Sequence, residues 1–527
     1  MYPDRKLVLL FVAVTRSRAA VDCDAFSSSC AACTTAHYDA ALPLSCSWNP
    51  MKLSCIRSTK NNDTLHYESE CPLGPIPYPP NPPEFLPDWM SFFHQAQLFD
   101  EVTLLDLCLP GTHDSLSYDL SLVISADGSG TLQRWVAFLK KLSHPGELED
   151  FFRTQAKTQQ LSITQQLDNG VRFFDLRMMR QPVNGRWYSV HFMQSQQTIE
   201  TYWHEIRNWL DLHPHEIVVL WLSRDGNPAA TGPDQYPNVT SEQKQAIWQN
   251  FTTIFGDLLI HTDEVNLWTD SVTFLIQRNY RVVPFVSDYH DFSQSSPLAL
   301  DAARIQNVWN LGDVFDAEDM TFHLKDYFQN AKVNNVAVHK RHGFTLLGMN
   351  TASPEWQVVA SAEKRFLGWK HDRRCSSHFQ TPEATHWCPE TLLDIVQLSS
   401  YYAQSVLEYA YDGIESKQLA FPNAIYLDAL DWGGTIRTGS QLLNGHDRGG
   451  AHENKISTYG YVDTVLSYNA QIACANDSQN QGCALFRKEM ARRKELHPHR
   501  LWDDPNFARY SSWPSFDSGE QLINTYR

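Results

Sequence analysis

Two histidines in this 527-residue chain follow short apolar runs, where together they could carry out acid–base chemistry. His113 ends the run Leu107-Cys-Leu-Pro-Gly-Thr-His and is followed by Asp114. His191 ends the run Trp187-Tyr-Ser-Val-His. Because histidine titrates near neutral pH, one imidazole can accept a proton while the other donates one. A lone histidine in such a place is more often structural, so each needs partners.

Charged residues end two other apolar runs. A strand over residues 171–178 puts Asp175 and Arg177 on one face by its period of two. Two inward charges are costly unless they are paired or bind a ligand, and a purely structural ion pair is the simpler alternative. The run that starts at Ala424 ends in two carboxylates, and position in the strand favours Asp428 over Asp431.

Strand and helix patterns alternate from Trp89 onward. Strands are expected at residues 102–109, 171–178, 217–222, 281–286, 344–349 and 424–430. Helices are expected at 199–212, 241–254, 316–330, 390–411 and 462–472. This alternation favours an α/β fold with a parallel sheet, most naturally a closed barrel. Pro110-Gly111 is expected to form a turn that presents His113 at the carboxyl end of its strand, where barrel active sites lie.

Three of these blocks, taken in order, resemble the catalytic region of the bacterial-type phosphatidylinositol-specific phospholipase C family. The family pattern is Pro-Gly-[Ser/Thr]-His-Asp-Ser, then Gln-Leu…Gly-[Val/Ala]-Arg-[Phe/Tyr]-x-Asp-Leu/Ile-Arg, then a histidine after a short strand. The matching segments here are Pro110–Ser115, Gln166–Arg177 and Trp187–His191. The resemblance is clear over residues 100–225 and diffuse from there to 475.

The resemblance implies a distorted (β/α)8 TIM barrel and phosphodiester cleavage without a metal or other cofactor. The implied substrates are inositol phospholipids or inositol-glycan anchors at a membrane surface. His113 would be the general base that activates the substrate's own 2-hydroxyl, and His191 the general acid that protonates the leaving group. A cyclic phosphodiester would form, and water could later open it.

The resemblance also implies roles for the charged residues. Arg177 would bind the phosphoryl oxygens, because its guanidinium offers a fixed fork of donors. Asp114 would orient His191, and Asp428 would orient His113. Substrate-binding candidates at other strand ends are Asp175, Arg224 and Trp309.

Two other functions remain open. One is a metal-dependent phosphodiesterase of the glycerophosphodiester or sphingomyelinase D type, in which carboxylates surround a magnesium or calcium ion. Arg177 argues against it, because it stands where a metal ligand would be needed. The other is a non-catalytic secreted binding protein on the same barrel, which the retention of both histidines and their charged neighbours disfavours.

The beginning of the chain has the pattern of a secretory signal peptide. Arg5 and Lys6 precede the apolar run 7–14, and Ala19-Ala20 offer small residues for cleavage. Eleven cysteines fit an oxidising compartment, with expected disulfides joining Cys375 to Cys388 and Cys474 to Cys483. Glycosylation sequons begin at Asn62, Asn238, Asn250 and Asn476. Secretion is expected, with delivery to a lysosome-like compartment as the alternative.

Five segments are expected along the chain. They are a signal peptide (1–20), a small N-terminal disulfide-rich module (21–71), a proline-rich linker (72–88), the barrel (89–475) and a C-terminal tail (476–527). The module resembles the plexin–semaphorin–integrin type, although Asn49 follows Trp48 where that pattern has a cysteine; its partner is unknown. A net charge of −17 argues against nucleic acid as a partner.

Overall fold

The computed structural model describes only part of the chain. The described residues are 46–49, 54–57, 86–125, 130–223 (except 142, 145 and 182), 239–307, 343–350, 421–428, 435–436, 454–455, 459–474 and 480–496, with isolated helical residues between 327 and 407. The chain divides into two compact units, 1–72 and 73–527. In the first unit β1 (Cys46–Asn49) and β2 (Ser54–Arg57) form an antiparallel hairpin. The expected signal peptide and most of the cysteine-rich module lie outside the described residues.

The larger unit contains an eleven-stranded sheet and the helices around it. The strands are β3 (Leu109–Thr112), β4 (Leu120–Ile124), β5 (Phe173–Arg180), β6 (Trp187–His191), β7 (Met193–Thr198), β8 (Val218–Ser223), β9 (Val282–Val286), β10 (Leu300–Asp301), β11 (Ile305–Asn307), β12 (Phe344–Met349) and β13 (Ala424–Leu427). A separate pair joins β14 (Thr435–Ile436) to β15 (Asn454–Lys455).

The described helices of this unit connect or flank those strands. They are α2 (Trp89–Gln95), α3 (Gly130–Leu139), α4 (Glu147–Ala156), α5 (Ile163–Asp168), α6 (Ile199–Leu212), α7 (Ser241–Phe255), α8 (Val272–Gln277), α9 (Tyr289–Phe292), α16 (Tyr459–Ala473) and α17 (Gln481–Leu496). Short 3-10 turns lie at Leu86–Asp88, Ser117–Asp119, Gly256–Leu258 and Ala302–Arg304. No helix in the described part of the chain combines the length and apolar character needed to cross a bilayer.

Eight strands form a continuous parallel path in the order β10-β9-β8-β5-β3-β13-β12-β11. Its end strands are neighbours in the chain, since only the turn Ala302–Arg304 separates Asp301 from Ile305. Four peptide links span at most about 15 Å, whereas eight strands in a flat sheet extend about 34 Å. The sheet must therefore curve until β10 and β11 approach each other. The strands follow one another in chain order around this curve, as the predicted α/β barrel requires.

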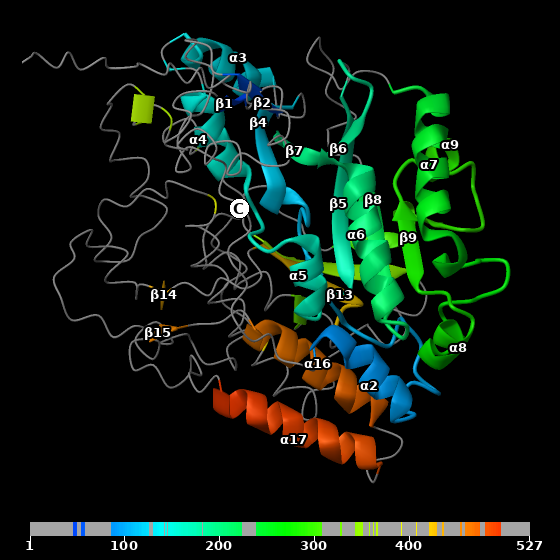
Figure 1. Ribbon diagram of the computed structural model, residues 1–527. Helices are drawn as coiled ribbons and strands as arrows, with labels where there is room; N and C mark the ends of the chain where they lie inside the picture. Colours follow the sequence, from blue (N-terminus) through cyan, green and yellow to red (C-terminus); the bar gives the residue numbers. More distant parts are fainter. Residues whose placement is uncertain are drawn as a thin grey trace, which may run out of the picture. The chain divides into compact units, whose positions relative to one another are not determined.

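Helices pack along the outside of the barrel. Figure 1 shows α5, α6 and α7 following one another beside β5, β8 and β9. Trp203 of α6 packs on Phe251 of α7, with ring centroids 5.0 Å apart. Inside the barrel, Phe344 contacts Phe173 and Phe285 at centroid distances of 5.7 and 5.3 Å. These aromatic rings fill the interior, so the barrel is a packed core that supports side chains at its carboxyl end.

The first barrel strand differs from its prediction. A strand was expected at 102–109, but Asp106 instead accepts hydrogen bonds from the backbone nitrogen and hydroxyl of Thr103, at 2.9 and 2.7 Å, which close a turn. The strand is β3, and it contains Pro110 and Gly111, which were expected to form a turn. A side chain at Gly111 would lie 3.0 Å from the carbonyl oxygen of Ile425, so glycine lets the neighbouring strands approach closely.

The other predicted elements that fall on described residues are found. The helix expected at 199–212 coincides with α6, and those expected at 241–254 and 462–472 lie within α7 and α16. The helices expected at 316–330 and 390–411 lie outside the described residues apart from isolated positions. The sequence did not predict the antiparallel extension, in which β5 continues past the barrel and pairs with β6, β6 with β7, and β7 with β4.

Part of the expected C-terminal tail packs against the barrel unit. Phe486 of α17 is buried against Phe92 and Phe93 of α2, at centroid distances of 6.4 and 5.1 Å. A disulfide joins Cys474 to Cys483 and so connects α16 to α17. The helix α17 is therefore attached to the barrel both covalently and through its apolar face.

Candidate active site

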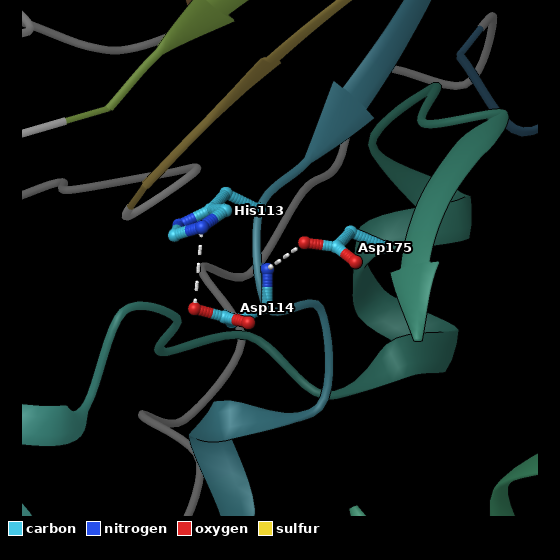
Figure 2. A group of neighbouring side chains, drawn as sticks. All are labelled: His113, Asp114 and Asp175. Atoms are coloured by element: carbon cyan, nitrogen blue, oxygen red, sulfur yellow. Dashed lines mark hydrogen bonds and ion pairs between the residues drawn. The ribbon is translucent and has the colours of Figure 1, made fainter. Parts of the chain in front are cut away.

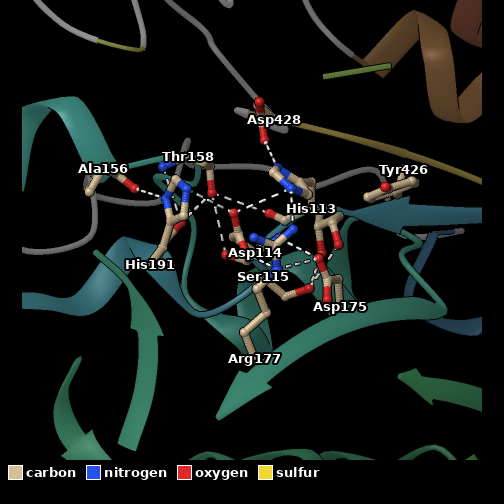
Figure 3. Close-up of polar contacts among 12 residues, drawn as sticks. His113, Asp114, Ser115, Ala156, Thr158, Asp175, Arg177, His191, Tyr426 and Asp428 are labelled. Carbon is tan, nitrogen blue, oxygen red and sulfur yellow. Dashed lines mark hydrogen bonds and ion pairs between the residues drawn. The ribbon is translucent and has the colours of Figure 1, made fainter. Parts of the chain in front are cut away.

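Six of the predicted residues meet at the carboxyl end of the barrel strands (Figure 3). His113 and Asp114 follow β3, Asp428 follows β13, Asp175 and Arg177 belong to β5, and His191 ends β6. Register explains the first contacts, because Thr112 pairs with Leu427 on one side and with Phe174 on the other. The next residues along the three strands are His113, Asp428 and Asp175, which therefore lie side by side.

His113 is fixed by a buried carboxylate. Its Nδ1 lies 2.8 Å from Oδ1 of Asp428, and the two side chains are 7% and 0% exposed. The carboxylate accepts the hydrogen bond from Nδ1–H, which makes Nε2 the basic nitrogen of the ring. The pKa of His113 is lowered well below its ordinary value, first by burial and then by the charges of Arg177 and His191. The imidazole is therefore neutral at pH 7.

Arg177 is the cation of the cluster. Its Nη2 lies 2.6 Å from Nε2 of His113, and its Nε lies 2.6 Å from Oδ1 of Asp114 and 3.2 Å from Oδ2 of Asp175. Because residues two apart in a strand share a face, Asp175 lies beneath Arg177 and supports the guanidinium. Asp175 is fully buried and also accepts a hydrogen bond from the Ser223 hydroxyl at 3.3 Å. Its position is that of a residue that orients Arg177.

Asp114 lies between the two histidines. Its Oδ2 is 3.3 Å from Nε2 of His113 and 3.4 Å from Nε2 of His191. The backbone has a φ of 42° at this residue, a left-handed conformation that aspartate tolerates better than most side chains. Figure 2 shows the Asp114 carboxylate pointing back toward the His113 ring, while its backbone nitrogen faces Asp175, at 3.4 Å from Oδ2. The tight bend after β3 thus places one carboxylate against both imidazoles.

His191 comes from the antiparallel extension and is less buried than His113. Its side chain is 26% exposed, and the two imidazole rings are 6.2 Å apart between centroids. Its Nδ1 lies 2.6 Å from the backbone carbonyl of Ala156, at the end of α4, and donates to it. Sequence reasoning missed Ala156, because a backbone acceptor leaves no side-chain signal. With Nδ1 occupied by this carbonyl, Nε2 of His191 faces Asp114.

A buried polar segment holds the loop that carries His113. The Gln159 amide donates to the carbonyls of His113 and Leu427, both at 2.8 Å, and so joins the ends of β3 and β13. The Thr158 hydroxyl lies 3.2 Å from the carbonyl of His113. Sequence reasoning missed this segment, because polar residues are usually exposed and only the structure shows that these are buried.

Three groups of the cluster could offer ligands to a metal ion. His113, Asp114 and Asp175 each have a ligand atom, and these atoms lie within 4.8 Å of one another. The guanidinium of Arg177, however, already forms ion pairs with both carboxylates. Arginine stays charged at any working pH, so it repels a cation at this place. The residues therefore fit an internal cation supplied by Arg177 better than they fit a metal.

Several predicted residues cannot be placed in this way. Arg224, Trp309, Asp431, Cys375, Cys388, Asn62, Asn238 and Asn476 lie outside the described residues. Asn250 is exposed on α7, and its glycosylation stays a prediction. Cys108 is buried and unpaired by disulfide, as an inert core thiol would be, and burial raises the pKa of its thiol.

Comparison with known proteins identifies part of the chain. Residues 150–249 match the family model PI-PLC X 1. PI-PLC X domain-containing protein 1 of Mus musculus is 31% identical over 180 residues, covering 34% of this chain and 48% of the relative. PI-PLC X domain-containing protein 3 of Danio rerio is 28% identical over 221 residues, covering 41% and 59%. The chain thus spans about half the length of these curated relatives.

Solved bacterial structures are more distant. A double mutant of the phosphatidylinositol-specific phospholipase C from S. aureus shares 14% identity, with a TM-score of 0.39 over 69% of this chain and 98% of that one. The enzyme from Listeria monocytogenes gives 14% and 0.37 over 65% and 94%. The barrel assignment accordingly rests on this chain's own strand pairing. The matched segment includes Asp175, Arg177 and His191, so this part of the chain is similar to the PI-PLC X domain.

Proposed function

We propose that this protein cleaves the phosphodiester of inositol phospholipids or inositol-glycan anchors, with His113 as general base and His191 as general acid. The observation that carries the proposal is the convergence of two imidazoles and one guanidinium on a single carboxylate, Asp114. Two hydroxyls near the cluster among the described residues, those of Ser115 and Thr158, hydrogen-bond to backbone carbonyls, which supports the substrate's own hydroxyl as the nucleophile. An internal nucleophile of this kind gains from proximity.

The resting contacts support a role for Arg177 in preparing the base. Arg177 donates to the lone pair of His113 Nε2 across 2.6 Å, so the base is occupied before the substrate binds. A phosphate offers a charged and better acceptor and would draw the guanidinium toward its own oxygens. Nε2 of His113 is then released to take the proton from the 2-hydroxyl. Arg177 stabilises the negative charge that builds up on phosphorus during the attack.

The position of His191 supports its role as the acid. Its side chain is partly exposed, and the carboxylate of Asp114 lies 3.4 Å from its Nε2. That carboxylate stabilises the protonated imidazolium before the proton is delivered to the departing oxygen. The glycerol oxygen of a lipid leaves toward the membrane, so a partly exposed acid suits it. A cyclic inositol phosphate and diacylglycerol result.

We also propose that the reaction needs no divalent cation and that the protein works in an oxidising compartment, either outside the cell or in a lysosome-like organelle. The charge that a metal would supply comes from Arg177. The disulfide between Cys474 and Cys483 supports the compartment.

The products test the proposal directly. Wild-type protein incubated with phosphatidylinositol should yield a cyclic inositol phosphate, observed by phosphorus NMR, and diacylglycerol. Formation of phosphatidic acid, or of a linear phosphate before any cyclic species, would contradict the internal nucleophile.

A further inference from the structure

Two polar side chains outside the catalytic cluster share its layer of the barrel. Trp221 pairs with Asp175 in the register of β8 and β5, and Ser223, two residues later, hydrogen-bonds to Asp175. Trp221 therefore faces the barrel interior beside Asp175, because residues two apart in a strand share a face.

Asn350 lies on the other side of the cluster. In β12, Gly348 pairs with Tyr426, whose ring is 5.4 Å from that of His113. Phe344, on the same face of β12, packs on Phe173 inside the barrel. Continued alternation puts Asn350, the residue that follows β12, on this inward face at the level of Asp428.

Both side chains bury polar atoms for which the described residues provide no hydrogen-bond partner. Asn350 is 1% exposed, and neither its Nδ2 nor its Oδ1 has a hydrogen-bond partner among the residues that the structure describes. The same holds for Nε1 of Trp221. Buried polar groups are normally paired, so two unpaired ones flanking a catalytic cluster indicate that something else pairs with them.

Two other buried asparagines, Asn423 and Asn469, show the contrast. The Oδ1 of Asn423 accepts from the Thr345 nitrogen and its Nδ2 donates to the Leu105 carbonyl, both at 2.7 Å. Asn469 binds both backbone groups of Cys108, at 2.8 and 2.7 Å. These two amides pair with backbone groups of the fold. Asn350 is equally buried, but its amide pairs with no group in the described part of the chain.

We propose that Asn350 and Trp221 bind ring hydroxyls of a polyol head group while its phosphate is held by Arg177. A hydroxyl both donates and accepts, and the Asn350 amide offers both functions. A phosphate oxygen only accepts and would leave Oδ1 of Asn350 unpaired. The proposal rests on the proposed function and makes these two residues the determinants of head-group choice, because a site built to pair with hydroxyls rejects ligands that lack them.

Stability and activity should respond in opposite ways to substitution. Asn350→Ala removes no protein hydrogen bond, so its melting temperature should stay the same or rise. Its kcat/KM for phosphatidylinositol should fall by about tenfold to a hundredfold, mainly through KM. Trp221→Phe keeps the ring and loses only the N–H donor, so it should lose about tenfold or less. The control Asn423→Ala should lower the melting temperature and leave kcat/KM unchanged below it.

A second lipid separates head-group recognition from catalysis. Phosphatidylglycerol also has a hydroxyl beside its phosphate but lacks the ring, so Asn350→Ala should change its cleavage by less than about threefold. Millimolar myo-inositol should raise the melting temperature of wild type and not that of Asn350→Ala.

If Asn350→Ala lowers the melting temperature and leaves the preference for phosphatidylinositol intact, the residue is structural and the inference is overturned. If wild type cleaves neither lipid but inositol still stabilises it through Asn350, the catalytic proposal fails and the binding site stands. Absence of both effects in wild type overturns both.

Discussion

The two histidines of the site occupy different kinds of structure. His113 stands on a barrel strand with its side chain 7% exposed, and a side-chain carboxylate holds its Nδ1. His191 stands on an antiparallel extension with its side chain 26% exposed, and a backbone carbonyl holds its Nδ1. The buried position keeps one imidazole neutral, as the proposed base requires. The more exposed position would let the other imidazole, the proposed acid, exchange protons with solvent.

Removal of either imidazole should have the largest effect on this pair. His113→Ala and His191→Ala should each lose on the order of 10²–10⁴ in kcat with the fold retained, because each is a proton-transfer group. Initial rates on phosphatidylinositol, with circular dichroism as the folding control, measure this. Activity within a few-fold of wild type in either variant would remove that histidine from the mechanism.

A substrate with a better leaving group should then distinguish the proposed acid, His191, from the proposed base, His113. An inositol phosphate ester of a nitrophenol needs no protonation of its leaving group, so it bypasses the acid but not the base. His191→Ala should recover at least about tenfold of its lost activity on this substrate, and His113→Ala should recover none. Equal rescue of both variants would mean that the roles are not divided as proposed.

The dependence of kcat/KM on pH should reflect the titration of His113, the buried histidine. Because the pKa of His113 is lowered, its neutral form persists below pH 6.5 and is lost only as the pH falls through the lowered value. The acid limb of kcat/KM should therefore lie below pH 6.5. An unfolded chain protonates this histidine near its ordinary pKa, so its contribution to stability is present above that pH and decreases below it. An Asp428→Asn variant, measured across the same pH range, checks that the acid limb belongs to His113. Because Asp428 contacts His113, the substitution should shift the pH of the limb. A limb that does not shift would belong to another group.

The smallest expected effect concerns Gln159, whose amide joins the strand ends that carry His113 and Asp428. Gln159→Leu leaves the carbonyls of His113 and Leu427 without their side-chain donor, so the free energy of unfolding should fall by about 1–3 kcal/mol. Denaturant titration measures this, with Gln197→Leu on β7, in the extension that carries His191, as the comparison. A Gln159→Leu variant as stable as wild type would show that the loop after β3 does not depend on the hydrogen bonds of Gln159.

Local patterns in the sequence were enough to find the residues on the barrel strands. Asp175 and Arg177 were placed on one face by alternation alone, and their side chains do meet at 3.2 Å. Pro110 and Gly111 were misassigned to a turn, because their local preference for turns is strong and the close approach of Ile425 is visible only in the fold.

Contacts between segments that are distant in the chain could not be predicted from the sequence. The Ala156 carbonyl meets His191 only because α4 ends beside β6, and the Gln159 amide reaches Leu427 across 268 positions. Neither contact has a periodic or compositional signal. The pairing of β4 with β7 was missed for the same reason, since these two strands lie far apart in the chain, whereas β5, β6 and β7 follow one another.

In the proposed mechanism, Arg177 supplies the positive charge that a metal ion supplies in metal-dependent phosphodiesterases. The direct measurement is the initial rate on phosphatidylinositol after dialysis against a strong chelator, with and without added calcium or magnesium, in wild type and Arg177→Ala. Wild-type activity should stay within about twofold under every condition, and Arg177→Ala should lose on the order of 10²–10³ that no cation restores. If chelation abolishes wild-type activity and calcium restores it, His113, Asp114 and Asp175 hold a metal and the role given to Arg177 is wrong.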